Sequence, residues 1–546
     1  MILNVYTGEI YPAHVAVHGE RIAYVGARED ALGPRTQVLE AAGRILTPGY
    51  IDPHVHPAHL VTPSAFARHV LPLGTTTVFA DTLQLWELGG RRGFEMVANT
   101  LAQSPLKFFW MIRVHAQSRS ADEGRRFPLR DVARALAHPW AIGVGEVTRW
   151  PEIHDGDADL LHRIDLARVR GLRVEGHTAG ASAEKIAALA AGGLTSDHEP
   201  ITVREVLERA RHGIAVMLRE SSLRPDLHGL LDVLKEAPAL ASRLMLTADG
   251  SMPAFVRDHG FVDHLLRVAL DRGVPPVDAY RMVTLNPATY FGRDDDLGGI
   301  APGRYADICV LADLSEPRPE RVVARGRLAA EGGRLLAEVP EPAWTRVFTS
   351  AEARLTVRWR ARPEDFRLPA RDRYPVIRLV SAVITKLEER APAAGDLHAA
   401  LVDRAGRWVA PAIVAGFADR LDAVASTITT DFNILVLGRS PEAMARAVNR
   451  VLELRGGIVV ADGDDVAEEW ALPVGGVMTT GTLPEVARGE DRIRAALVAR
   501  GYPYHDPMFT LFFLAADFLP AARLSPRGVW DVKGARVLWP ARRRSR

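Results

Sequence analysis

Between residue 50 and about residue 250, short apolar runs alternate with stretches of helical periodicity. Each run carries a polar or titratable residue at or next to its end; the runs are "YIDPHVH", "TTTVFAD", "FFWMIRVHA", "AIGVGEV", "LRVEGHT", "LTSDHE", "IAVMLRE" and "RLMLTAD". Helical patterns lie between them, as in "SAEKIAALAAGG" (182–193) and "VREVLERARHG" (203–213). Repeated strand–helix units of this kind predict a parallel barrel. We therefore expect an α/β fold with a distorted (β/α)8 barrel over residues 50–295.

The segments on either side of this region have the sequence pattern of short strands. "HVAVHGERIAYVG" alternates apolar and polar positions and is broken at Gly19–Glu20, which predicts a hairpin. After the barrel, "LGGIAPGRYADICVLADL" (297–314) again has a strand-like pattern. We expect residues 1–49 and 296–337 to form one small composite β-sandwich.

The remainder of the chain divides into a connecting segment and a second large domain. Residues 338–375 are rich in proline and arginine, which predicts a linker containing a strand or two. Residues 376–546 are expected to form a C-terminal α/β domain. Within it, "FNILVLGRSPEAMARAVNRVLELRGGIVVADGD" (432–464) has the pattern of a strand–helix–strand unit.

Composition narrows the class of protein. A chain of 546 residues, 47% hydrophobic and 25% charged, is too long for one core and has an ordinary globular balance. The formal charge of +1 offers no electrostatic basis for binding nucleic acid or an anionic membrane. Cys309 is the one cysteine, which excludes intrachain disulfides and thiolate zinc clusters. The N-terminus lacks a signal-peptide pattern, and apolar stretches such as 509–518 are too short to span a membrane, so we expect a cytoplasmic protein.

Titratable residues at the predicted strand ends suggest a metal site. His54 and His56 lie two residues apart, so in a strand they face the same side, although such a pair by itself more often means two core or surface histidines. The carboxyl ends of barrel strands meet at one face, where four imidazoles and two carboxylates can hold two divalent cations if one carboxylate is shared. The candidate ligands are His54, His56, Glu146, His177, His198 and Asp249.

The prediction of the ligand shared by the two metal ions depends on where the chain lacks lysine. Barrels of this type often use a modified lysine, but the five lysines lie at 107, 185, 235, 386 and 533, none at a strand end near 146. Glu146 is therefore the bridging candidate. Neighbouring positions supply candidate substrate-binding residues: Asp81, Gln84, His115, Glu199 and Glu220. Glu199 could instead point away from the metal and anchor a loop, and Glu220 could equally belong to an ion pair.

Several segments carry a resemblance to known proteins. They include "TPGYIDPHVH", "LPLGTTTVFAD", "EGHTAGASAEKIAALAAGGLTSDHE", "GGIAPGRYADICVL", "NILVLGRSPEAMARAVNRVLELRGGIVV" and "FTLFFLAADFLPAARLSPRGVWDV". With these segments the chain resembles the amidohydrolase superfamily and, within it, the adenine deaminase family. The likeness covers nearly the whole chain, and its C-terminal part narrows it to the adenine deaminases.

The resemblance implies a metal-dependent hydrolase acting on carbon–nitrogen bonds other than peptide bonds. His54, His56 and Asp249 would bind one metal ion and His177 and His198 the other, with Glu146 shared. Manganese or iron is typical of the family, and zinc suits the same ligands. Asp249 would take the proton of a hydroxide bridging the metals and pass it to the leaving nitrogen, converting adenine or a related 6-aminopurine to hypoxanthine and ammonia. The resemblance also implies a homo-oligomer.

The substrate side departs from the family pattern. "HVHPAHLVTP" lacks a family glutamate, Leu83 and Gln84 replace a histidine and a glutamate, and "ITTDFN" (428–433) replaces a histidine-rich segment. Gly250 replaces the second of two adjacent aspartates. Each lost polar partner would cost about 1–3 kcal/mol. Another cyclic amide or amidine therefore stays an alternative substrate, unless His59, His115 and Gln84 compensate. A catalytically degenerate binding protein is the remaining alternative.

Overall fold

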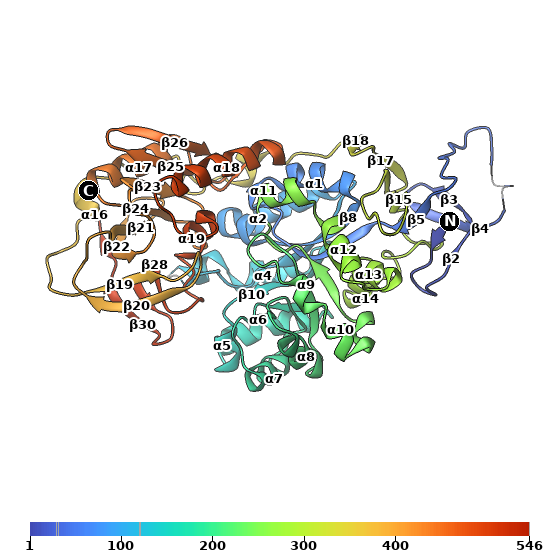
Figure 1. The fold of residues 1–546 in the computed structure, drawn as a ribbon, viewed down its shortest axis with the longest axis horizontal. Coiled ribbons are helices and arrows are strands. Elements are labelled where there is room, and N and C mark those ends of the chain that lie inside the picture. Colours follow the sequence, from blue (N-terminus) through green and yellow to red (C-terminus); the bar gives the residue numbers. More distant parts are fainter. Residues whose placement is uncertain (29, 31, 120–121, 545–546) are drawn as a thin grey trace.

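The structure, a computed structural model, describes residues 1–28, 30, 32–119 and 122–544. The molecule is elongated, with the two ends of the chain at opposite ends of its long axis and the barrel between them (Figure 1). Within the described ranges, none of the helices combines the length and the apolar composition needed to cross a membrane.

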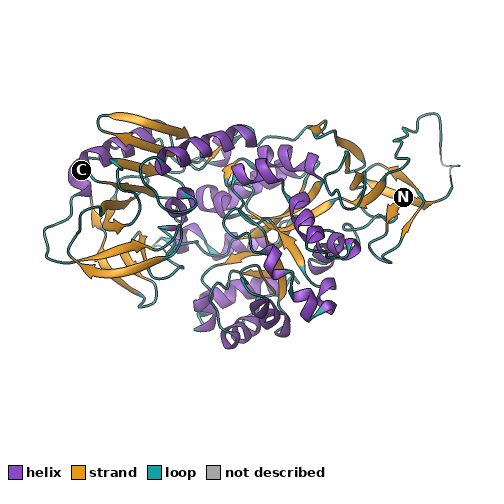
Figure 2. Cartoon of the chain, in the orientation of Figure 1, coloured by secondary structure: helices purple, strands orange, loops and turns teal. Residues whose placement is uncertain are grey.

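Eight parallel strands form the predicted barrel, which helices surround (Figure 2). Their order is β14-β13-β12-β11-β10-β9-β8-β6, and a parallel bridge between Val55 and Asp249 joins the two ends. Most positions in these strands are buried, which explains why they appear in the sequence as continuous apolar runs. The strands are β6 (Tyr50–Val55), β8 (Thr75–Asp81), β9 (Lys107–Ile112), β10 (Ala141–Val147), β11 (Arg173–Gly176), β12 (Ser196–Asp197), β13 (Ala215–Arg219) and β14 (Met245–Thr247).

The helices of this region include the two that the sequence singled out. α8 (Val203–Arg211) begins at Thr202, which forms a capping box with Glu205, and α7 (Ala183–Ala191) precedes it. The others are α1 (Pro63–Val70), α2 (Leu83–Leu101), α3 (Glu123–Arg126), α4 (Leu129–Leu136), α5 (Trp150–His154), α6 (Ala158–Arg168), α9 (Leu227–Leu230), α10 (Val233–Glu236), α11 (Pro253–His259), α12 (Val262–Asp271), α13 (Pro276–Met282) and α14 (Leu285–Tyr290).

Strands from before and after the barrel share one seven-stranded sheet, in the order β18-β17-β16-β15-β5-β1-β2. These are β1 (Ile2–Leu3), β2 (Ile10–Tyr11), β5 (Ile45–Pro48), β15 (Ile308–Leu311), β16 (Arg321–Ala324), β17 (Arg327–Glu331) and β18 (Arg334–Leu335). The predicted hairpin is present as β3 (His14–His18) and β4 (Arg21–Gly26), which turn at Gly19 and Glu20. Lys107 of the barrel forms a buried ion pair with Asp307, which ties this sheet to the barrel.

The proline- and arginine-rich segment differs from expectation. Between residues 338 and 373 the structure has two four-residue helices, α15 (Trp344–Val347) and α16 (Pro363–Phe366), where we expected a strand or two. Leu355 and Phe366 from this segment are buried in the core of the C-terminal domain. The segment therefore packs against that domain, and its prolines lack the backbone N–H that pairing in a sheet requires.

The C-terminal domain is built on a nine-stranded sheet covered by helices. The predicted strand–helix–strand unit is β24 (Ile434–Gly438), α17 (Pro441–Glu453) and β25 (Gly457–Asp462). The other strands of the sheet are β19 (Tyr374–Leu379), β20 (Thr385–Arg390), β21 (Leu397–Val402), β22 (Trp408–Ala415), β23 (Ala423–Ser426), β26 (Asp465–Ala471) and β31 (Arg542–Arg543). A three-stranded sheet of β28 (Ala522–Ser525), β29 (Gly528–Asp531) and β30 (Arg536–Pro540) accompanies it, with helices α18 (Leu483–Val498) and α19 (Pro507–Phe513).

The C-terminal domain contacts the barrel near the carboxyl ends of its strands. β27 (Met478–Thr479) pairs with β7 (Leu60–Val61), which follows the first barrel strand. Helix α18 packs on α11, which follows the last barrel strand, and the carboxylate of Glu490 accepts a hydrogen bond from the backbone of Ala254. The domain therefore borders the face of the barrel at which catalytic residues gather in this architecture.

Candidate metal centre

The barrel places the six predicted ligands on five of its strands. His54 lies near the end of β6 and His56 directly after it, while Glu146 lies near the end of β10. His177 and His198 directly follow β11 and β12. Asp249 lies two residues beyond β14 with a φ of 50°, a left-handed conformation that is uncommon for a residue with a side chain and recurs at functional sites.

The first group of candidate ligands is His54, His56 and Asp249. The Oδ1 atom of Asp249 lies 3.3 Å from His54 Nε2 and 3.4 Å from His56 Nε2. The other oxygen, Oδ2, accepts a hydrogen bond from Arg219 at 2.9 Å. One oxygen of the Asp249 carboxylate therefore faces the two imidazoles, and the other faces the guanidinium of Arg219.

The second group is Glu146, His177 and His198. Oε1 of Glu146 contacts His177 Nδ1 and lies 3.9 Å from His198 Nε2. Its other oxygen, Oε2, lies 3.6 Å from His56 Nε2. Glu146 thus faces both groups, as a shared ligand must.

Buried imidazole nitrogens without partners test whether these residues suit a metal. Nε2 of His54, Nδ1 of His177 and Nε2 of His198 are buried and form no hydrogen bond of acceptable geometry with the described residues. A buried polar atom without a partner is costly, and each of these nitrogens faces a carboxylate oxygen within 4 Å. Neutral imidazoles interleaved with carboxylates are the donor set that divalent transition metals take. The residues fit.

The electrostatics also favour a bound cation. Burial by itself would lower the pKa of His177, but Glu199 and Glu146 outweigh burial and raise that pKa to about 9. Burial would raise the pKa of Glu146, yet His177 and Arg113 hold that pKa well below its usual range. Glu146 is therefore a carboxylate, and His177 attracts a positive ion, either a proton or a metal in its place.

Glu175 orients two of the histidines, although the sequence patterns did not single it out. Its Oε2 lies 2.9 Å from Nδ1 of His54, and its Oε1 lies 3.3 Å from Nδ1 of His198. The two rings are stacked 4.3 Å apart. A carboxylate on Nδ1 keeps the proton there and leaves Nε2 free as a ligand. A signal for it was present, since an acidic residue inside the apolar run "LRVEGHT" needs a buried partner.

The residues predicted to bind substrate divide into those near the metal centre and those elsewhere. Glu199 lies near it, with Oε1 at 3.5 Å from His177 Nδ1 and 3.7 Å from His198 Nε2, and is paired with Arg219. Asp81 also lies near it, in a group with His56 and Glu146.

The other three predicted residues are not in these groups. His115 does not close its strand, because β9 ends at Ile112, and its Nδ1 bonds the backbone of Ala116. Glu220 accepts a hydrogen bond from the backbone of Leu227 and points toward His264. Gln84 is buried at the start of α2, and its side-chain oxygen has no hydrogen-bond partner among the described residues. A substrate role for these three stays a prediction.

A segment of the C-terminal domain reaches the candidate metal centre. The ring of Phe518 lies edge-on to His177 with centroids 5.8 Å apart, and Phe512 meets His59 at 5.0 Å. The backbone N–H of Arg119, in the loop after β9, donates to Asp517 at 3.1 Å. The barrel and the C-terminal domain therefore both contribute to the surroundings of the candidate ligands.

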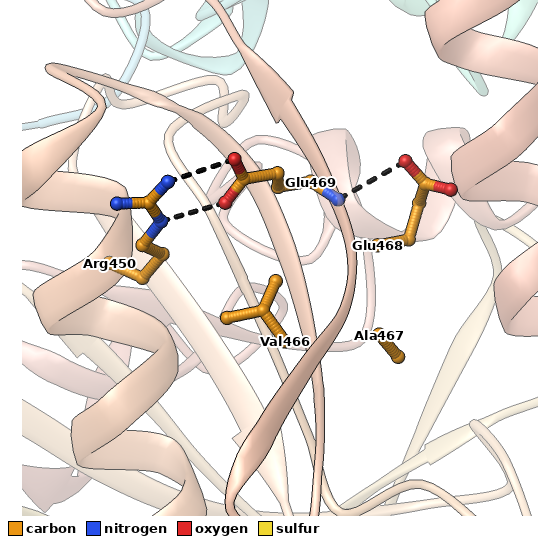
Figure 3. Close-up of a pocket in the computed structure, with 5 residues that line it drawn as sticks. All are labelled: Arg450, Val466, Ala467, Glu468 and Glu469. Carbon is orange, nitrogen blue, oxygen red and sulfur yellow. Dashed lines mark hydrogen bonds and ion pairs between the residues drawn. The ribbon is translucent and has the colours of Figure 1, made fainter.

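Elsewhere in the C-terminal domain the surface is shallowly hollowed. Figure 3 shows this depression, in which Arg450 of α17 pairs with Glu469 of β26 beside Val466. Its lining contains none of the candidate ligands. This depression is therefore separate from the candidate metal centre.

The barrel and the imidazole–carboxylate cluster at the ends of its strands are the features of a barrel hydrolase. Comparison with known families agrees: residues 45–329 match the amidohydrolase family, and residues 382–536 match the adenine deaminase C-terminal domain. The protein is an enzyme of this hydrolytic class.

Individual relatives extend the likeness to the full chain. An adenine deaminase of Rubrobacter xylanophilus is 35% identical over 97% of this chain and 92% of its own length. A putative adenine deaminase of Halalkalibacterium halodurans is 33% identical over 99% of this chain and 94% of its own. A solved β-aspartyl dipeptidase from Fervidobacterium islandicum has 20% identity and a TM-score of 0.48 over 62% of this chain and 97% of its own. The chain belongs to the amidohydrolase family and, within it, to the adenine deaminase family.

Proposed function

We propose that this protein hydrolytically deaminates adenine, or a closely related 6-aminopurine, to hypoxanthine and ammonia. The observation that carries the proposal is the convergence of His54, His56, Glu146, His177, His198 and Asp249 at one end of the barrel. The full-length likeness to adenine deaminases, including the C-terminal domain, supports the choice of substrate.

We further propose that these residues hold two divalent metal ions, manganese or iron in preference to zinc. His54, His56 and Asp249 would hold one ion, His177 and His198 the other, with Glu146 shared. When bound, such a metal pair supplies Lewis acidity that makes water nucleophilic near neutral pH. Homo-oligomeric assembly and a cytoplasmic location stay predictions.

The protein's own residues account for the proton transfers. Asp249, held in its left-handed conformation, would accept the proton of the attacking water and deliver it to the departing nitrogen. Arg219 contacts both Asp249 and Glu199 from a buried position, so it fixes the direction of the Asp249 carboxylate. Phe518 contributes an apolar face next to His177, which helps to exclude bulk water.

A second candidate is hydrolysis of another cyclic amide or amidine by the same residues. It is favoured by Leu83 and Phe432, which are apolar and buried at positions where the family resemblance implies polar side chains. Attack on either kind of substrate forms a tetrahedral centre, so the metal ligands and Asp249 do not discriminate between them.

Metal analysis joined to a substrate screen tests both candidates. We expect about two divalent ions per chain and release of ammonia from adenine, with activity reduced at least about 1,000-fold in Asp249→Asn. Ring opening of lactams or imides without ammonia release from any aminopurine would favour the second candidate. Full hydrolytic activity in Asp249→Asn would refute the proton-transfer role.

A further inference from the structure

Arg113 is a buried cation beside the candidate bridging ligand. It directly follows Ile112, the last residue of β9, and its side chain has no exposed surface. Its Nη2 donates to Oε2 of Glu146 at 2.5 Å, and its Nη1 donates to the backbone oxygen of Glu146 at 2.8 Å. One guanidinium thus binds both the side chain and the backbone of Glu146.

Asp81 completes the arrangement. Its two oxygens accept from Nε of Arg113 at 2.8 and 2.9 Å, and Oδ2 also accepts from the backbone N–H of Glu146 at 3.1 Å. Gly145 leaves the space that this requires, because a Cβ there would lie 2.7 Å from Oδ2 of Asp81. The N–H, the C=O and the carboxylate of Glu146 are therefore each held by the Arg113–Asp81 pair.

Other protein groups occupy the remaining hydrogen-bonding positions of Arg113 and Asp81. Arg113 also donates to Oε1 of Gln117, and Asp81 also accepts from the backbone of Leu83 at 2.7 Å. Asp81 therefore has little capacity left to serve as a metal ligand, although it lies near His56 and Glu146. Arg113 likewise is oriented toward Glu146 and away from a role as a substrate-binding group.

A bridging carboxylate has to direct its two oxygens at two different ions. Glutamate has three rotatable side-chain bonds, and fixing them costs entropy unless neighbouring groups hold the side chain in place. The planar fork of arginine binds several acceptors in one geometry, which the single ammonium of lysine does not reproduce.

We propose that Arg113, held by Asp81, is a positioning residue that fixes Glu146 as the ligand shared between the two metal ions. This rests on the metal ligands assigned under the proposed function. Outer groups that orient ligands typically change metal affinity by about 10–100-fold when they are replaced. Loss of Arg113 is expected to weaken the binding of Glu146 as the shared ligand, and so to abolish the magnetic coupling between the two ions.

The test compares Arg113→Lys with the wild-type protein loaded with Mn²⁺. Arg163→Lys is the matched control, because Arg163 of α6 is also buried but bonds Asp159 and the backbone of Val114 and Phe127, and none of the candidate ligands. Mn²⁺ per chain is measured after dialysis against a chelator, and the electron paramagnetic resonance spectrum distinguishes a coupled pair of ions from isolated ones. Thermal unfolding checks that each variant is folded.

We expect Arg113→Lys to bind one of the two ions about 10–100-fold more weakly and to show the spectrum of isolated Mn²⁺, while Arg163→Lys keeps the coupled pair. A coupled spectrum and wild-type affinity in Arg113→Lys would overturn the positioning role. If that variant does not fold, Asp81→Asn, which keeps the shape of the side chain, is expected to show the same loss, and wild-type behaviour in it overturns the proposal. A wild-type protein without a coupled pair would instead refute the binuclear site on which the proposal depends.

Discussion

Replacement of Glu175 by glutamine is a sharp test of the metal centre, because this residue contacts one histidine from each ligand group. Its side chain is 2% exposed, and its oxygens lie 2.9 Å from His54 Nδ1 and 3.3 Å from His198 Nδ1. Glutamine has nearly the same shape, so the core volume is preserved. What changes is that one acceptor becomes an NH₂ donor.

The consequence follows from histidine tautomers. The NH₂ group of the introduced glutamine would face a ring nitrogen that carries a proton, and the clash is relieved if that histidine moves its proton to Nε2. Nε2 is the atom that faces the carboxylate ligands in both His54 and His198. A protonated Nε2 cannot bind a metal, so one ligand of one site is lost or weakened.

The expected magnitude is a 10–100-fold loss of affinity for one ion, or about 1.4–2.7 kcal/mol. It can be measured by competition with a chromogenic chelator near pH 7.5 and by metal content per chain. Glu184→Gln, at an exposed position of α7, is the control. Wild-type affinity for both ions in Glu175→Gln would show that Nδ1 hydrogen bonding does not set the ligand tautomer here.

Two further predictions concern the C-terminal domain. Burial is the largest influence on Glu490 and raises its pKa from 4.5 to about 7, so the folded state binds more protons than the unfolded state in this window; stability should fall by about 3 kcal/mol as the pH rises from 4.5 through 7. Urea unfolding at pH 5 and pH 8 should show a smaller decline in Glu490→Gln, and an equal decline would contradict this account. Phe518→Ala should raise KM about fivefold and change kcat less, because it removes an aromatic face next to His177 but no metal ligand. Steady-state kinetics with adenine measures both constants, and an unchanged KM would argue against contact with the substrate.

The C-terminal domain lies next to the candidate metal centre. Paired strands β7 and β27 and the packed helices α11 and α18 attach it to segments that follow barrel strands. Through Phe512, Asp517 and Phe518 it reaches the loops around the metal centre. Substitutions in this domain are therefore expected to affect substrate binding as well as folding.

The sequence by itself determined the barrel and the identity of the candidate ligands that meet at the carboxyl ends of its strands. Parallel barrel strands are buried on both faces, so each is a continuous apolar run, and a titratable residue at the end of such a run is conspicuous. Because parallel strands bring their carboxyl ends to one face, residues as far apart as His54 and Asp249 could be predicted to meet.

Only the tertiary structure decided which charged groups hold those ligands in place. Glu175 and Arg113 interrupt apolar runs, but their partners, His54 and Glu146, come from other strands, and the register between strands is not encoded in periodicity. The same holds for β7 and β27, two-residue strands that are too short to show a pattern yet join the two domains. Local alternation reports whether a residue is buried, whereas its partner across the fold depends on packing of the whole chain.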